Sequence, residues 1–287
     1  MSSSPAIRGI ILMVASTVCF STMHAAISFI SSELHPFQIA FFRNFFGLLI
    51  FLPVVFRSGL GFLRTDRLSM HILRALLNVG AMLAFFSALA MTPIARVTAL
   101  AFTAPLFMAI LSVMFLNERL DATRIGATVL GFLGTAIVLR LDLVAIDIGA
   151  ILVIGSAATW AVTMIVIKKL ARTESSLTIT GYMSILLSVL SFVPALLTWT
   201  WPSAFAWMML VFIGVSGTIA QLALAESLKQ ADATAVMPFD FLKLVWAALL
   251  GYILFAQAPD GSTWIGGALI FGAGIFVLYK ERTPANK

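Results

Sequence analysis

Apolar residues fill almost the whole chain, and short polar turns divide them into ten stretches. The stretches lie near residues 7–31, 36–57, 69–91, 95–116, 123–140, 147–170, 177–200, 204–228, 232–256 and 262–280. Each is close to the about 20 residues that a helix needs to cross the hydrocarbon layer of a bilayer. The pattern predicts an all-α integral membrane protein with ten transmembrane helices and no room for a separate soluble domain.

The composition supports this prediction. Hydrophobic residues make up 61% of the chain and charged residues only 10%, with a mean hydropathy of +1.06. A soluble domain usually has about 25% charged residues. We therefore expect the lipid bilayer to be the main partner of this surface.

The basic residues fall almost wholly on alternate turns. Only Arg96 and Arg140 lie on the turns of the opposite set. Because Lys and Arg are retained on the cytoplasmic side, we expect both termini in the cytoplasm of a bacterial inner membrane. The asymmetry explains the net charge of +6 without a nucleic-acid partner. Fourteen basic residues lie at the termini and the even-numbered turns: Arg8, Arg57, Arg64, Arg67, Arg74, Arg119, Arg124, Lys168, Lys169, Arg172, Lys229, Lys280, Arg282 and Lys287.

Reactive residues are too few and too scattered for a catalytic or metal site. Cys19 is the single cysteine, so neither a disulfide nor a cysteine-based metal site is expected. His24, His35 and His71 lie at different depths, and neither an HExxH motif nor a Walker-type phosphate loop occurs. We expect no enzyme activity, no metal, no cofactor and no direct use of ATP.

The two halves of the chain carry similar residues at a constant offset of 140 positions. This similarity predicts two repeats, at residues 1–142 and 143–287. Since each repeat holds five spans, the second must enter the membrane from the opposite side. Two inverted five-helix repeats around a central cavity can exchange conformations and expose one site to either side in turn. Matching pairs include Gly9 and Gly149, Ser16 and Ser156, Phe20 and Trp160, Gly126 and Gly266, and Gly134 and Gly274.

Two motifs resemble those of the drug/metabolite transporter superfamily and, within it, of the EamA-type ten-helix permeases. They are Phe41-Phe42-Arg43-Asn44 in the second span, and Thr103-Ala104-Pro105-Leu106-Phe107 leading to Asn117-Glu118-Arg119-Leu120 in the fourth. The second half departs from this pattern, with Val245 and Ala258 at the positions that correspond to Pro105 and Glu118. The resemblance covers essentially the whole chain and implies a metabolite exporter, similar to the YddG-type carriers of aromatic and neutral amino acids.

Charged residues inside spans are costly and are therefore functional candidates. Asp240 and Lys243 lie near mid-depth of the ninth span, and their spacing of three places them on one helical face. Two interpretations stay open. The residues form an internal ion pair, or Lys243 attracts the carboxylate of a zwitterion and Asp240 its ammonium group. Pro238, just upstream, predicts a kink or an unwound turn beside them.

The remaining candidates are single polar or aromatic residues within the spans. His24 is expected to be either a hydrogen-bonded interior histidine or the carrier of a coupled proton. Aromatic walls suit apolar or aromatic ligands. Arg43 either binds a carboxylate or has the architectural role that the family resemblance implies, and the second is favoured. Structural or gating roles are expected for Arg43, Glu118, Pro105 and Pro238. The complete set of candidate substrate contacts is Asp240, Lys243, Trp160, Phe20, His24, Asn78, Tyr182 and Trp246.

These residues predict a secondary or facilitative transporter of small amphipathic metabolites. A cavity with few cations favours neutral or aromatic amino acids over sugar phosphates, and export follows from the family resemblance alone. Drug-like, nucleotide-derived or quaternary-ammonium metabolites are the alternative substrate class. Glycines in the fifth and tenth spans, such as Gly126, Gly134, Gly266 and Gly274, suit either close helix packing or a homodimer contact.

Overall fold

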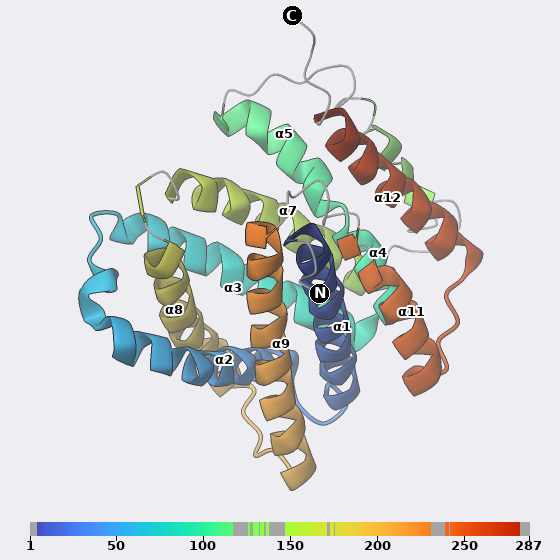
Figure 1. Cartoon of the computed structure of the whole chain (residues 1–287). Helices are drawn as coiled ribbons and strands as arrows, with labels where there is room; N and C mark the ends of the chain where they lie inside the picture. The colour runs from blue at the N-terminus through green and yellow to red at the C-terminus, as the bar shows by residue number, and fades with distance from the viewer. Residues whose placement is uncertain are drawn as a thin grey trace, which may run out of the picture.

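The structure is a computed structural model that describes residues 5–116, 126, 129–131, 133–134, 136–137, 147–170, 173–174, 176–230, 239–240 and 242–281. Helices account for nearly all of these residues, and no β-strand occurs among them. In chain order the helices are α1 (Pro5–Ile30), α2 (Pro36–Ser58), the 3-10 helix η1 (Leu60–Leu63), α3 (Leu68–Met91), α4 (Ile94–Ala101), α5 (Ala104–Leu116), α7 (Ile148–Leu170), α8 (Ser176–Leu197), α9 (Ala204–Gln230), α11 (Leu242–Phe255) and α12 (Gly261–Glu281) (Figure 1).

Five of these helices are long and apolar enough to cross a membrane. They cover Ile7–Ile30, Leu68–Met91, Ile148–Ile167, Thr178–Leu197 and Ala204–Ser227, and Pro36–Ile50 and Leu242–Phe255 are shorter apolar helices. Each agrees with one of the expected spans. More than half of the fifth expected span, 123–140, lies outside the described residues, and so does the beginning of the ninth.

The fourth expected span differs from the prediction because it is broken. Helix α4 ends at Ala101, and α5 begins at Ala104 after a turn at Phe102 and Thr103. Pro105 explains the break, since proline has no N–H group and its ring clashes with the carbonyl four residues earlier in a continuous helix. The Thr103 hydroxyl donates to the Leu100 carbonyl at 2.7 Å. Discontinuous helices of this kind are typical of transporter binding regions.

Helices of the first half pack mainly on helices of the second half. Helix α1 packs most extensively on α9, and α3 on α7 (Figure 1). The hydroxyls of Ser16 and Ser227 donate to Ala220 O at 2.8 Å and Gly9 O at 2.7 Å, so α1 and α9 run antiparallel. Ser156, the counterpart of Ser16, donates to Ala81 O of α3 at 2.7 Å.

The second helices of the two halves, α2 and α8, also run antiparallel. Asn44 Nδ2 donates to Ser191 Oγ at 3.2 Å, whereas the later residues Gly47 and Leu48 lie beside the earlier residues Thr180 and Ser184. Helix α9 approaches α2 closely at Gly214, where a methyl group would collide with Cβ of Phe46. Glycine is therefore required at this crossing.

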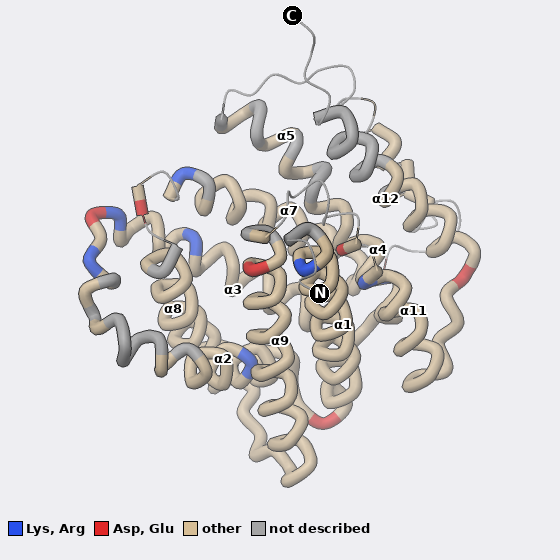
Figure 2. Tube along the Cα trace, in the orientation of Figure 1, with Lys and Arg blue, Asp and Glu red and all other residues tan. Residues whose placement is uncertain are grey.

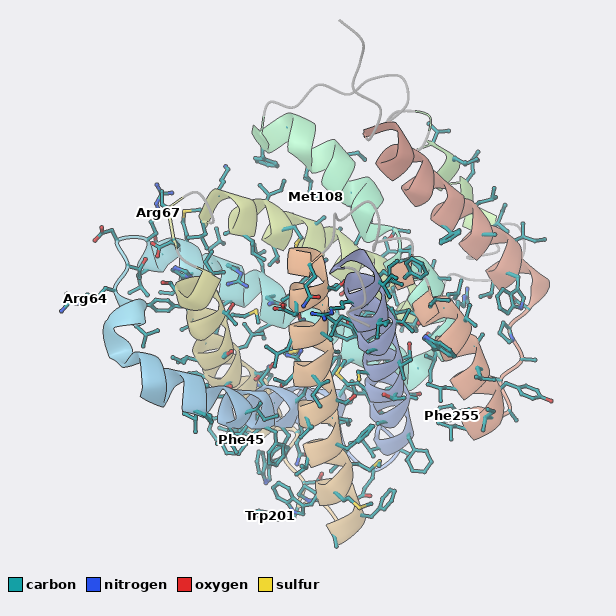
Figure 3. The ribbon with its side chains drawn as sticks, viewed as in Figure 1. Phe45, Arg64, Arg67, Met108, Trp201 and Phe255 are labelled. Atoms are coloured by element: carbon teal, nitrogen blue, oxygen red, sulfur yellow. The ribbon has the colours of Figure 1, made fainter. Side chains whose placement is uncertain are left out.

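The molecule has a basic end and a tryptophan end. Arg64 and Arg67 lie at the first, on the left of the view, and Trp201 lies at the second, at the bottom (Figure 3). Between them the tube carries few charges (Figure 2). The largest apolar core includes Ile39 and Leu210 and contacts Trp199 and Trp207, so it lies toward the tryptophan end. The buried apolar clusters described nearer the basic end are much smaller.

Candidate functional site

Asp240 and Lys243 form an ion pair at the beginning of α11. Asp240 lies just before the helix, and Lys243 lies in its first turn. Lys243 Nζ lies 2.5 Å from Asp240 Oδ1, and the two side chains are 20% and 16% exposed. The geometry is the one that the three-residue spacing predicts. The pair neutralises two charges that would each be costly at this depth. Whether the same groups bind a zwitterionic substrate stays a prediction.

Aromatic side chains of α1 and α11 surround this pair. Lys243 Nζ lies 4.7 Å from the ring centroid of Phe20, which is a cation–π contact. Trp246 Nε1 donates to the Thr17 hydroxyl at 3.1 Å, and the Ser21 hydroxyl donates to the Lys243 carbonyl at 3.4 Å. The structure therefore brings four of the candidate residues together: Phe20, Asp240, Lys243 and Trp246.

His24 lies beside these four residues, on the side toward α2 and α3. Its ring centroid lies 6.2 Å from that of Phe20 and 5.1 Å from that of Phe85. Both Lys243 and Arg43 act on His24 electrostatically. His24 therefore lies within electrostatic range of both cationic side chains.

Arg43 lines a cavity between α2, α8 and α9. The cavity has a volume of about 90 Å³. Arg43 Nη1 donates to Asn44 Oδ1 at 2.9 Å, and no carboxylate pairs with Arg43 among the described residues. Sequence reasoning favoured an architectural role for Arg43 and gave no signal for the cavity. Its lining comprises Arg43, Asn44, Gly47, Leu48, Thr180, Met183, Ser184, Leu187, Thr218, Gln221 and Leu222.

Tyr182 lies near the basic end of α8. Its ring stacks on His71 with centroids 4.5 Å apart, and its hydroxyl donates to Leu63 O at 2.7 Å. Nearby, Arg74 Nη1 donates to Ile179 O at 2.8 Å. Tyr182 thus joins the two halves at the basic end, and no contact among the described residues links it to the Asp240–Lys243 pair.

The other candidates are more dispersed. Asn78 is buried in α3, and Trp160 is half-buried in α7. Within the part of the chain that the structure describes, no hydrogen bond, ion pair or ring contact joins either to the Asp240–Lys243 pair. Pro105 is the second residue of α5. Glu118 and Pro238 lie outside the described residues, so their expected roles are untested.

The chain matches a family model twice. The model is that of the EamA-like transporter family, and the matches cover residues 7–140 and 147–279. One solved crystal structure has a TM-score of 0.66 with 21% sequence identity, and the similarity covers 96% of this chain and 99% of the other. That likeness concerns the fold alone.

Several curated transporters are similar over nearly their whole length. The S-adenosylmethionine uptake transporter of Rickettsia felis is 33% identical, over 98% of this chain and 96% of the relative. The riboflavin transporter of Rhizobium johnstonii is 32% identical, also over 98% and 96%. The pseudopaline exporter of Pseudomonas aeruginosa is 26% identical, over 93% and 94%. These relatives move different solutes, and their names include both uptake and export.

Proposed function

The chain belongs to the EamA-like transporter family, and from this premise we propose that it carries S-adenosylmethionine or a close structural analogue across the bacterial inner membrane. As a member of that family it is a multi-pass membrane transporter of small metabolites and not an enzyme. We place both termini in the cytoplasm, which assigns the basic end of the molecule to the cytoplasmic face. The solute gradients then determine the direction of net flux.

The observation that supports this substrate is the pairing of charge and aromatic surface around Lys243. S-adenosylmethionine combines an adenine ring and a cationic sulfonium with an amino-acid group that is itself zwitterionic. Lys243 now occupies the face of Phe20 at 4.7 Å, a position that suits a sulfonium or ammonium cation. Displacement of Lys243 by the substrate would leave Asp240 available for the substrate cation. The aromatic rings of Phe20, Phe85 and Trp246 offer surface for adenine.

Two inverted five-helix repeats, at residues 1–142 and 143–287, provide the mechanism in this proposal. The antiparallel contact of α2 with α8 supports it, since these two helices correspond in the two repeats and run in opposite directions. The concentration of the apolar core at the tryptophan end supports a conformation closed on that side. Rocking of one set of helices against the other would then open the tryptophan end and close the basic end.

Riboflavin is the second candidate substrate. The relatives named riboflavin transporters, at 31% and 32% identity, favour it. It is aromatic and hydroxylated but carries no zwitterionic group, so it makes no use of the Asp240–Lys243 pair. Neutral and aromatic amino acids, the class suggested first by the sequence, share the zwitterionic group but lack a nucleoside.

Counterflow in proteoliposomes tests the substrate. Liposomes preloaded with unlabelled solute are mixed with labelled S-adenosylmethionine, riboflavin or tryptophan outside. We expect accumulation of labelled S-adenosylmethionine, and a strong loss of it in Lys243→Gln and in Asp240→Asn. Accumulation of riboflavin alone, unaffected by either substitution, would refute the proposal and favour the second candidate.

A matched control is available at the tryptophan end. Arg96 and Asp147 form an ion pair of 2.7 Å with side chains 24% and 42% exposed. Arg96→Gln removes a positive charge as Lys243→Gln does, but away from the aromatic group. Its counterflow should stay near that of the parent. An equal loss in both variants would mean that charge removal acts through folding or insertion.

A further inference from the structure

Lys243 and Arg43 differ in how their charges are balanced. Lys243 lies 2.5 Å from a carboxylate oxygen of Asp240. Arg43 has no carboxylate partner among the described residues. An ionised side chain in a span is costly unless it is paired or faces a cavity. Arg43 faces a cavity, so we expect the anion that balances its charge to bind in that cavity.

Among the described residues, most N–H donors of Arg43 have no hydrogen-bond partner. A guanidinium has five N–H donors, and the single hydrogen bond described for Arg43 runs from Nη1 to Asn44 Oδ1. Its Nε and Nη2 lie beside Gly217, at 3.3 and 3.7 Å from the position that a Cβ there would take. The adjacent donors of a guanidinium suit the two oxygens of a carboxylate.

The wall of the cavity complements an anion without neutralising Arg43. Asn44, Thr218 and Gln221 contribute amide and hydroxyl groups, and none of the described residues that line it is acidic. The volume of about 90 Å³ is several times the about 10–15 Å³ that one water requires. A carboxylate with attendant water fits such a space.

We propose that Arg43 is the carboxylate-binding residue of the transport pathway. The class of ligand is a metabolite with one carboxylate, bound by the guanidinium of Arg43, while the cationic part of the same molecule lies toward Phe20 and Asp240. The His24 ring lies 6.2 Å from that of Phe20 and within electrostatic range of both cations. The identity of the metabolite rests on the proposed function, whereas the preference for a carboxylate does not.

The test measures equilibrium binding of matched ligand pairs to the purified full chain in detergent. Each pair differs only in the carboxylate: S-adenosylmethionine with its decarboxylated analogue, and tryptophan with tryptamine. We expect the parent to prefer the carboxylate member. Arg43→Gln should reduce that preference by about 30-fold or more, as for other buried charge pairs. Arg43→Lys should lose part of it, because an ammonium lacks the guanidinium geometry.

Arg74→Gln is the matched control, since Arg74 is a buried arginine of α3 that does not line the cavity. It should keep the preference of the parent. If Arg43→Gln does not yield a monodisperse protein, the same binding measurement is made on Arg43→Lys. Full retention of the carboxylate preference in that variant would overturn the proposal. An equal loss in Arg74→Gln would also overturn it.

The two proposals fail in different ways. A parent that discriminates tryptophan from tryptamine but does not bind S-adenosylmethionine refutes the proposed substrate and supports the role of Arg43. A parent that binds S-adenosylmethionine and its decarboxylated analogue equally refutes the role of Arg43 and leaves the substrate intact.

Discussion

Lys243 and Arg43 are both cations within helices, but their surroundings are opposite. Lys243 pairs with Asp240 and lies on the ring of Phe20. Arg43 touches the neutral Asn44 and opens onto a cavity. An ion pair within the protein stabilises the empty state, whereas an unpaired cation is stabilised only when a ligand arrives. The Asp240–Lys243 pair should therefore matter more for stability, and Arg43 more for ligand binding.

Removing one partner of the ion pair should have the largest effect on stability. Asp240→Asn leaves the Lys243 ammonium without its carboxylate. Breaking a buried pair costs about 3–5 kcal/mol, and the partial exposure of both side chains places this case near about 3 kcal/mol. The measurement is thermal unfolding of the purified protein in detergent.

The double variant Asp240→Asn/Lys243→Gln sharpens this prediction. It removes both charges, so most of the lost stability should return, although counterflow should not. Arg43→Gln should leave the unfolding temperature unchanged or raise it. If Asp240→Asn unfolds at the temperature of the parent, the ion pair does not stabilise the empty state and the comparison fails.

Gly217→Ala perturbs the Arg43 side of the comparison without changing any charge. A Cβ at this position would lie 2.6 Å from Met23 Sδ and 3.3 Å from Arg43 Nε. Such overpacking typically costs about 1–3 kcal/mol, and Met23 can absorb part of it. We expect a smaller fall in the unfolding temperature than for Asp240→Asn, together with a weaker preference for carboxylate ligands. An unchanged preference would show that the guanidinium does not need its present position.

Phe20→Leu tests the aromatic contact of Lys243. Leucine keeps an apolar side chain but removes the ring under the ammonium. A cation–π contact contributes about 0.5–2 kcal/mol, so the stability loss should be modest. The apparent affinity for S-adenosylmethionine should fall more than that for riboflavin, and equal losses for both solutes would argue against a cation site on this ring.

Arg96→Gln should have the smallest effect. The Arg96–Asp147 pair is partly exposed, and such pairs contribute about 0–1 kcal/mol. Asp147 keeps its second role, because its Oδ1 still accepts from the Ala150 N–H that opens α7. A loss as large as that of Asp240→Asn would contradict the idea that depth in the membrane distinguishes the two pairs.

The local sequence pattern predicted the Asp240–Lys243 pair but not the cavity at Arg43. The spacing of Asp240 and Lys243 places them on one face of any helix, so their contact follows from the sequence. The cavity at Arg43 needs α2, α8 and α9 at once, and the contacts of Asn44 with Ser191 span 147 positions. No local rule brings such residues together.

The same distinction holds for the fold. The apolar stretches predicted the long helices, since hydrophobic length alone determines a span. The break between α4 and α5 was missed, although Pro105 provided a signal for it. The packing of α1 on α9 could not be predicted, because hydroxyl-to-carbonyl contacts such as that of Ser16 with Ala220 depend on tertiary structure.

Thiol labelling at position 24 tests most directly whether a bound substrate extends from Lys243 to Arg43. Cys19, the single native cysteine, is replaced by alanine, and His24→Cys is introduced and checked for S-adenosylmethionine counterflow in proteoliposomes. We predict that saturating S-adenosylmethionine slows maleimide labelling of this cysteine, and that its decarboxylated analogue protects less. An unchanged labelling rate, in a variant that still transports S-adenosylmethionine, would contradict a binding path from Lys243 to Arg43.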